Sequence, residues 1–196
     1  MYARDNPFRG ERLHALRFRF AVGDDHEALL ARVMAQGGRG AIVGPHGSGK
    51  TTLMLELAPL LRARGYAVRA LRIGAERRSL SGEEWRSLTA GLGPRDAILF
   101  DGAGHLMLWT WWRLRDRLRA AGVLIVTAHR AHRGPVVVRT ATSPELLREL
   151  VAELDPTVGD AQIRDACHEA RCDLRAALRS LYESAWINRP APDPTH

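Results

Sequence analysis

The chain has 196 residues, of which 45% are hydrophobic and 26% charged, and this size supports one well-filled core with a small second lobe. No run of 18 uncharged apolar residues occurs, and the N-terminus lacks the apolar stretch of a secretory signal, so we expect a cytoplasmic protein without membrane contact. The net charge of +7 would ordinarily suggest nucleic acid as a partner. Nearly all of the positive charge is arginine spread along the chain, however, which is typical of a GC-rich coding bias.

The first half of the chain alternates strand and helix patterns. Residues 15–22 alternate apolar and basic side chains, which predicts a strand, and Asp24 and Asp25 offer N-caps for the helix that follows. A serine at position 81 opens another helix, which ends near Gly91 or Gly93. In order, the predicted elements after the first strand are helix 26–35, strand 41–43, helix 50–64, strand 67–73 and the helix from Ser81.

The second half completes this alternation and then becomes helical. Pro144 follows Ser143, and proline is favoured at the first position of a helix. The predicted elements are strand 97–100, helix 105–120, strands 123–127 and 136–140, and helices 144–154, 159–170 and 172–187. Strands that alternate with helices predict a parallel sheet covered by helices on both faces.

The predicted fold is therefore α/β, a P-loop NTPase three-layer parallel sheet with a small C-terminal all-helical lid lobe. We expect three parts along the chain. They are a nucleotide-binding core at 1–142, a helical lobe at 143–188, and a loose proline-containing tail at 189–196.

Residues 44–51 read G-P-H-G-S-G-K-T, a complete match to the phosphate-binding pattern G-x-x-x-x-G-K-[ST], between a short strand and a helix. Glycines let successive backbone N–H groups turn toward phosphates, and the following helix directs its N-terminal dipole to the same place. The candidate nucleotide-binding residues are Gly44, Pro45, His46, Gly47, Ser48, Gly49, Lys50, Thr51 and Thr52.

Lys50 is the only lysine in the sequence. A composition that uses arginine almost everywhere has kept a compact ammonium at the one place where the pattern requires it. We expect Lys50 to neutralise the β- and γ-phosphates, the Thr51 hydroxyl to ligate Mg²⁺, and Thr52 to contact the α-phosphate. The predicted cofactors are ATP and Mg²⁺.

An acidic partner for the metal is predicted at Asp101, which follows four apolar residues at the carboxyl end of a strand. Thr51 and Asp101 are the candidate metal residues. The alternative is that Asp101 only caps the next helix. Many ATPases carry a glutamate directly after this aspartate to activate water, but Gly102, Ala103 and Gly104 follow here. His105 is the nearest group that could polarise a water, so binding is better supported than fast hydrolysis.

Another apolar strand ends in Thr127, followed by His129 and Arg130. A hydroxyl or imidazole there could sense the γ-phosphate or orient water. The alternative is a strand that runs into an ordinary polar turn.

The layout over residues 6–187 resembles the AAA+ branch of P-loop ATPases, and initiator-like and transposition-regulator ATPases in particular. The resemblance rests on the loop 44–51, the strand ending in Asp101, Thr127 at a sensor-1-like position, the helical lobe and the entry segment N-P-F-R-G at 6–10. Within the lobe, C-D-L-R-A-A-L at 172–178 is similar to the sensor-2 helix, which implies that Arg175 lies over the γ-phosphate.

The sequence departs from that family in two places. The glutamate after Asp101 is missing, and the segment 130–135 is too short for the usual helix that carries an arginine finger. Arg130 and Arg133 could serve in its place across a subunit interface. Ring assembly is not implied.

Three tryptophans crowd the start of the helix predicted at 105–120. Trp111 shares a face with other apolar residues at helical spacing, which predicts a core position. Trp109 and Trp112 fall on other faces, where three roles are open: packing in the core or beneath the lid, contact with a protein, or stacking on bases beside the neighbouring arginines. Arg77 and Arg78 are expected in a loop, as solvated side chains.

The leading functional prediction is an ATP-binding protein, a slow ATPase that acts as a nucleotide-dependent switch. Its partners would be ATP and a protein or a second copy of the chain, with nucleic acid as a further possibility. The alternative is a small-molecule or nucleoside kinase, although the segment 74–82 offers only Glu76 as an acidic residue. A scaffold that binds nucleotide for stability alone is the third possibility.

Overall fold

The computed structural model describes residues 16–21, 23–131, 133–171 and 173–187. These residues divide into two compact units. The core unit comprises residues 18–44 and 49–140, and the helical unit comprises residues 16–17, 45–48 and 141–187. Three parts of the sequence named above lie outside the described residues: the entry segment at 6–10, Cys172 and the tail at 189–196. The prediction of three domains remains a prediction.

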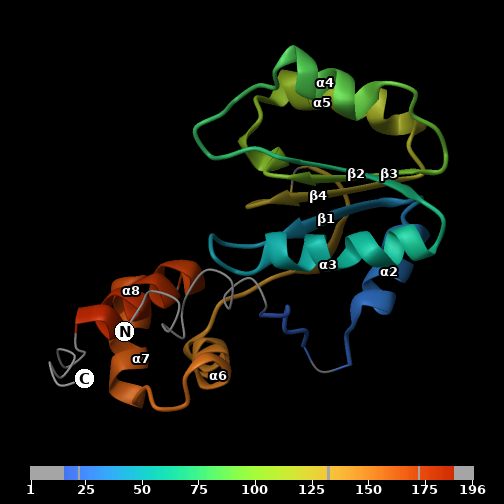
Figure 1. The fold of residues 1–196 in the computed structure, drawn as a ribbon. Coiled ribbons are helices and arrows are strands. Elements are labelled where there is room, and N and C mark those ends of the chain that lie inside the picture. The colour runs from blue at the N-terminus through green and yellow to red at the C-terminus, as the bar shows by residue number, and fades with distance from the viewer. Residues whose placement is uncertain (1–15, 22, 132, 172, 188–196) are drawn as a thin grey trace, which may run out of the picture. The chain divides into compact units, whose positions relative to one another are not determined.

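The core unit contains a five-stranded parallel sheet (Figure 1). Its order is β2-β3-β4-β1-β5, so the phosphate loop follows a strand that lies between two neighbours. The strands are β1 (Arg39–Val43), β2 (Ala67–Arg72), β3 (Asp96–Asp101), β4 (Val123–Ala128) and β5 (Val136–Arg139). All four strand pairs are parallel, which confirms the α/β fold predicted from the alternation of elements.

The three central strands are buried on both faces, and successive side chains enter different cores. Ile42, Leu99 and Ile125 belong to one hydrophobic cluster with residues of the helices α2 (His26–Ala35) and α3 (Lys50–Ala63). Val43, Phe100 and their neighbours pack in a second cluster on the opposite face. This two-residue period explains why the strands read as continuous apolar runs, as expected of a parallel sheet with helices on both sides.

Helices α2 (His26–Ala35) and α3 (Lys50–Ala63) cover one face of the sheet (Figure 1). The Asp25 side chain accepts a hydrogen bond from the Ala28 amide, which confirms the predicted N-cap of α2. Helix α3 begins directly at Lys50 because Gly49, with a φ of 80°, turns the chain into it. The first turn of α3 thus lies at the carboxyl edge of β1.

Helices α4 (Gly82–Thr89) and α5 (Leu108–Arg117) cover the other face (Figure 1). Ser81 and Glu84 form a capping box at the start of α4. The helix predicted over 105–120 is divided into η2 (Ala103–His105), α5 and η3 (Leu118–Ala120). Trp111 is 1% exposed and lies near Phe100, so the prediction of a core position is confirmed.

The helical unit consists of α6 (Pro144–Leu154), α7 (Asp160–Glu169) and α8 (Leu174–Ile187), close to the predicted bounds. Ser143 caps α6 by accepting a hydrogen bond from the Leu146 amide, and Pro144 takes the first helical position. The three helices share a hydrophobic cluster of their own, which contains the buried Cys167. The predicted all-helical lobe is confirmed as a fold element.

The strand predicted over residues 15–22 is wrong for the described part of that range. Residues 16–21 have no regular secondary structure. Phe18 and Phe20 instead pack against the first core cluster, and the Phe18 amide donates a hydrogen bond to Glu56. The alternation puts the two rings on the same side of the segment, which predicted a strand. The segment pairs with none of the described strands, however. Among the described residues, no helix is long and apolar enough to cross a membrane.

Candidate functional site

The phosphate loop joins β1 to α3 and is held by short hydrogen bonds of its own. The Ser48 hydroxyl, in a side chain that is buried, donates to the Pro45 carbonyl oxygen at 2.8 Å. Lys50 Nζ donates to the Gly44 carbonyl oxygen at 2.9 Å, so the ammonium folds back along the loop. An ammonium with three N–H donors can keep this bond and still bind phosphate oxygens.

Asp101 ends β3 beside this loop, and the structure brings it together with two threonine hydroxyls. Thr51 donates to Asp101 Oδ2 at 2.8 Å, and Thr127 donates to Asp101 Oδ1 at 2.6 Å. Asp101 and Thr127 are 7% and 1% exposed. The alignment of β3 with β4 explains this geometry, because carboxyl ends of neighbouring parallel strands meet at one edge.

This donor set suits Mg²⁺, which prefers oxygen ligands from one or two carboxylates together with phosphate oxygens and water. The Thr51 hydroxyl can donate its hydrogen to Asp101 and keep lone pairs for a metal. Asp101 is the last residue of β3 and does not cap a helix, because it accepts its side-chain hydrogen bonds from Thr51 and Thr127 and the following η2 has no side-chain cap.

The residue that follows Asp101 is Gly102, and the backbone at this position leaves no room for a side chain. Its φ is +88°, and a Cβ at this position would lie 2.3 Å from the Ile73 carbonyl oxygen. Its amide donates to the Thr127 hydroxyl at 2.8 Å. The chain passes too close to Ile73 for any side chain, so a water-activating carboxylate at this position cannot be accommodated without a shift of the backbone.

Arg72 is a charged residue at this edge that the sequence analysis did not single out. It ends β2, and its Nε lies 3.4 Å from Asp101 Oδ2, with the side chain 60% exposed. β2 pairs with β3 so that Arg72 is aligned with Asp101. The only sequence signal was its position at the end of a strand, one step before the predicted boundary.

His129 and His105 approach the same edge. His129 Nδ1 lies 3.2 Å from the Gly44 carbonyl oxygen, and the two imidazole rings have centroids 5.4 Å apart. His105 belongs to η2, which contacts β4. Both predicted imidazoles are therefore near the base of the phosphate loop, where one could orient a water.

Arg133 is wrong as a candidate arginine finger. It is 6% exposed, donates to the Leu106 carbonyl oxygen at 2.6 Å, and lies 5.8 Å from the centroid of a Trp111 ring. Burial lowers the pKa of its guanidinium by desolvation. A residue so enclosed cannot reach a neighbouring subunit. Arg130 is exposed, so its assignment as an arginine finger stays a prediction.

Arg175 and Thr52 lie on helices in the described structure. Arg175 is an exposed residue in the first turn of α8. Thr52 is half-buried in the first turn of α3. Their expected contacts with the γ- and α-phosphates remain predictions.

Comparison with known proteins supports the fold. No family model and no curated protein matches the sequence. Among solved structures, the chain is similar to a crystal structure of a DNA replication initiation factor, with a TM-score of 0.56 and 16% sequence identity. The match covers 86% of this chain and 63% of that one, so the chain spans less than two thirds of that protein's length. At this identity the similarity concerns the fold alone.

Proposed function

We propose that this chain binds Mg·ATP at the loop 44–51 and acts as a slow ATPase that switches its affinity for a macromolecular partner. The observation that carries the proposal is the position of Asp101, whose two oxygens accept hydrogen bonds from Thr51 and Thr127. Lys50 would bind the β- and γ-phosphates, and Thr51 and Asp101 would hold the metal, which supplies charge neutralisation on the phosphates when bound.

Slow turnover follows from Gly102. No carboxylate can stand directly after Asp101, which leaves His105 or His129 to orient a water. An imidazole that only orients water gives less acceleration than a carboxylate general base held in line with the phosphate. ATP would then persist long enough for the bound state to serve as a signal.

The resemblance to AAA+ proteins suggests how binding would be transmitted, because it assigns Arg175 of the helical unit to the γ-phosphate. The similarity to a replication initiation factor is compatible with a partner in nucleic-acid transactions. A nucleoside or small-molecule kinase is the competing function, and its acceptor would be needed for ATP consumption.

Titration calorimetry with ATP, in Mg²⁺ and in EDTA, tests the proposal. We expect Lys50→Ala to weaken ATP binding at least about tenfold, and Asp101→Asn to remove the difference between Mg²⁺ and EDTA. Asp116→Asn, an exposed carboxylate on α5, is the matched control. Absence of ATP binding by the unaltered chain would contradict the proposal. Formation of ADP that requires an added nucleoside and releases no inorganic phosphate would favour the kinase.

A further inference from the structure

Four large apolar side chains are exposed at the start of α5. Met107, Leu108, Trp109 and Trp112 are 57%, 47%, 72% and 48% exposed. The side chains of α5 and η3 that pack in the second core cluster are Trp111, Leu114 and Leu118. The four exposed side chains are therefore not part of the core. For Trp109, the alternative of a core position is wrong. Such an apolar group on a surface marks an interaction site.

The patch continues into a groove between α4 and α5. Trp85, Trp109, Thr110 and Arg113 line a cleft of about 370 Å³. A second cleft of about 460 Å³ is lined by Trp85 together with residues that include Leu92 and Arg117. Trp85 lines both clefts, so they adjoin at its side chain, and we refer to the two together as the α4–α5 groove. We call this groove and the patch (Trp85, Met107, Leu108, Trp109 and Trp112) the tryptophan surface.

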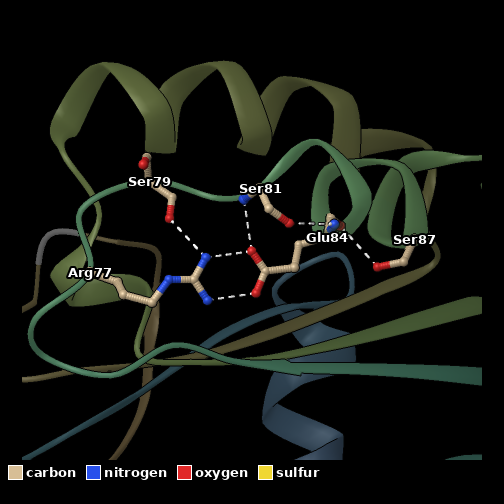
Figure 2. A network of polar contacts seen from close by, with 5 residues as sticks. All are labelled: Arg77, Ser79, Ser81, Glu84 and Ser87. Atoms are coloured by element: carbon tan, nitrogen blue, oxygen red, sulfur yellow. Dashed lines mark hydrogen bonds and ion pairs between the residues drawn. The ribbon is translucent and has the colours of Figure 1, made fainter.

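Polar contacts fix the loop before α4 and the first turn of α4, the helix that carries Trp85 (Figure 2). Arg77 forms a two-pronged ion pair with Glu84 at 2.6 and 2.5 Å, and Glu84 also accepts from the Ser81 amide. The loop position of Arg77 suggested a solvated side chain, and this prediction is wrong because the guanidinium is paired with Glu84. Arg78 connects this loop to α5, since its carbonyl oxygen accepts from the Met107 amide at 3.0 Å. A surface held in this way loses little freedom when a partner binds.

Positive side chains lie in and near the surface, since Arg113 and Arg117 line its clefts. Arg113, Arg115, Arg117 and Arg119 are all exposed along α5 and η3, and Asp116 is their only acidic neighbour there, paired with Arg119 at 3.5 Å. Residues 18–140 contain 19 lysines and arginines against 10 acidic residues, whereas residues 141–187 contain 5 against 9. The positive charge is thus concentrated in the core rather than spread along the chain. A ligand for this surface should be acidic.

The composition favours a protein over single-stranded nucleic acid. Met107 and Leu108 have no ring on which a base could stack, and Trp109 and Trp112 pack edge to face, with centroids 5.5 Å apart. That arrangement covers a ring face that stacking would use. Tryptophan, methionine and arginine together are typical of protein interfaces.

The described part of this chain offers no suitable segment to occupy the groove of a second copy. Its acidic helix α6 buries Leu147, Leu150, Val151 and Leu154 in the core of the helical unit. None of the exposed large apolar side chains lies in the described residues of 141–184.

We propose that the tryptophan surface binds an acidic amphipathic segment of another protein, with apolar side chains in the α4–α5 groove and carboxylates against the arginines of α5. The inference identifies the partner of the proposed switch and rests on that proposal only for its nucleotide dependence. Binding itself is expected with and without ATP, so the two proposals can fail separately.

Fluorescence anisotropy with three labelled peptides tests this inference. The first has about 16 residues with leucines at helical spacing and glutamates elsewhere, the second is its scrambled form, and the third has lysines in place of glutamates. We expect the first to bind at least about tenfold more tightly than either of the others. Equal affinities for the first and scrambled peptides would overturn the inference.

Variants locate the binding on the surface. Trp109→Ala and Trp112→Ala should each weaken binding of the acidic peptide about tenfold, and Arg113→Glu should weaken it while improving binding of the lysine peptide. Leu55→Ala, at an exposed leucine of α3, is the matched control and should change nothing. Circular dichroism verifies folding. Unaltered affinity in Trp109→Ala, tighter binding of an oligothymidylate at the same tryptophans, or self-association that Trp109→Ala abolishes would each overturn the inference.

Discussion

Each oxygen of Asp101 accepts a hydrogen bond from a threonine hydroxyl. One of the two threonines is Thr127, the residue predicted at the sensor position. Thr127 is almost fully buried, donates to Asp101 and accepts from the Gly102 amide. Its hydroxyl is therefore engaged with the Asp101 carboxylate and the Gly102 amide. We therefore propose that Thr127 positions Asp101.

Replacing Thr127 by valine keeps the shape and removes both hydrogen bonds. Because a hydrogen bond to a charged group contributes about 1.5–3 kcal/mol, we expect the Mg²⁺-dependent part of ATP binding to weaken at least about tenfold. Titration calorimetry measures this loss. Thr89→Val, which removes a hydroxyl bonded to the Trp85 carbonyl oxygen on α4, is the control and should leave ATP affinity unchanged. If both variants bind alike, Thr127 does not position Asp101.

Gly102 is expected to be intolerant of any side chain, including the missing glutamate. Gly102→Ala combines a left-handed backbone with a Cβ 2.3 Å from the Ile73 oxygen. Gly65→Ala is the matched control, because Gly65 has a φ of +82° with nothing within 4 Å of the added atom. We expect urea unfolding to show about 1 kcal/mol lost at Gly65 and clearly more at Gly102. Gly102→Glu should not accelerate ATP hydrolysis; faster hydrolysis would contradict this account.

At the scale of elements, the helices whose ends carry local signals were predicted best. Helices 26–35 and 144–154 have the predicted bounds because Asp25 and Ser143 cap them through contacts within three residues. The strand at 15–22 failed because a strand needs a neighbour, which alternation alone does not supply. The Arg77–Glu84 pair also went unpredicted, since it depends on how the loop after β2 returns to α4.

That ion pair predicts a pH dependence for α4 and its loop. The Arg77 guanidinium, with the Ser81 amide, lowers the pKa of Glu84 from its ordinary 4.5 to about 2. A carboxyl whose pKa is lower in the folded chain stabilises it above the unfolded value, and this contribution falls away as the pH drops toward 2. Glu84→Gln should therefore lower the Tm at pH 7 and have progressively less effect below pH 4.5.

Thermal unfolding of Glu84→Gln beside the unaltered chain, from neutral to acidic pH, measures this effect. Glu83→Gln is the control, because Glu83 is exposed in the same helical turn, whereas Glu84 is the carboxylate that binds Arg77 and Ser81 in the network of Figure 2. A Tm difference that stays constant as the pH falls would show that Glu84 does not act through its charge.

At the scale of the whole molecule, the sequence predicted both the sheet-and-helix core and the helical unit, but not what unites the site. The loop 44–51 was evident from its motif, and Asp101 from its strand end. That Thr127 meets Asp101 depends on β4 lying beside β3, and chain order does not specify the sheet order β2-β3-β4-β1-β5. The exposure of Trp109 was equally beyond periodicity, which separates helix faces without saying which of them remain uncovered.

The proposed switch makes its own prediction at this scale, because binding of ATP at the loop 44–51 should alter the helices α6, α7 and α8 through Arg175. In the unaltered chain, Mg·ATP should slow hydrogen exchange in α6, α7 and α8 as well as in the phosphate loop, since ligand binding stabilises whatever it engages. Arg175→Ala should abolish the slowing in the three helices and keep it at the loop. A guanidinium that binds a phosphate supplies charge-assisted hydrogen bonds that alanine cannot replace.

Arg179→Ala provides the matched control, because Arg179 is exposed on the same helix one turn later and removes the same charge. It should behave as the unaltered chain does. If Arg175→Ala and Arg179→Ala both keep the slowing of exchange in the three helices, the sensor-2 assignment is wrong. If neither the variants nor the unaltered chain show it, ATP is held without the three helices, and the nucleotide serves stability rather than a switch.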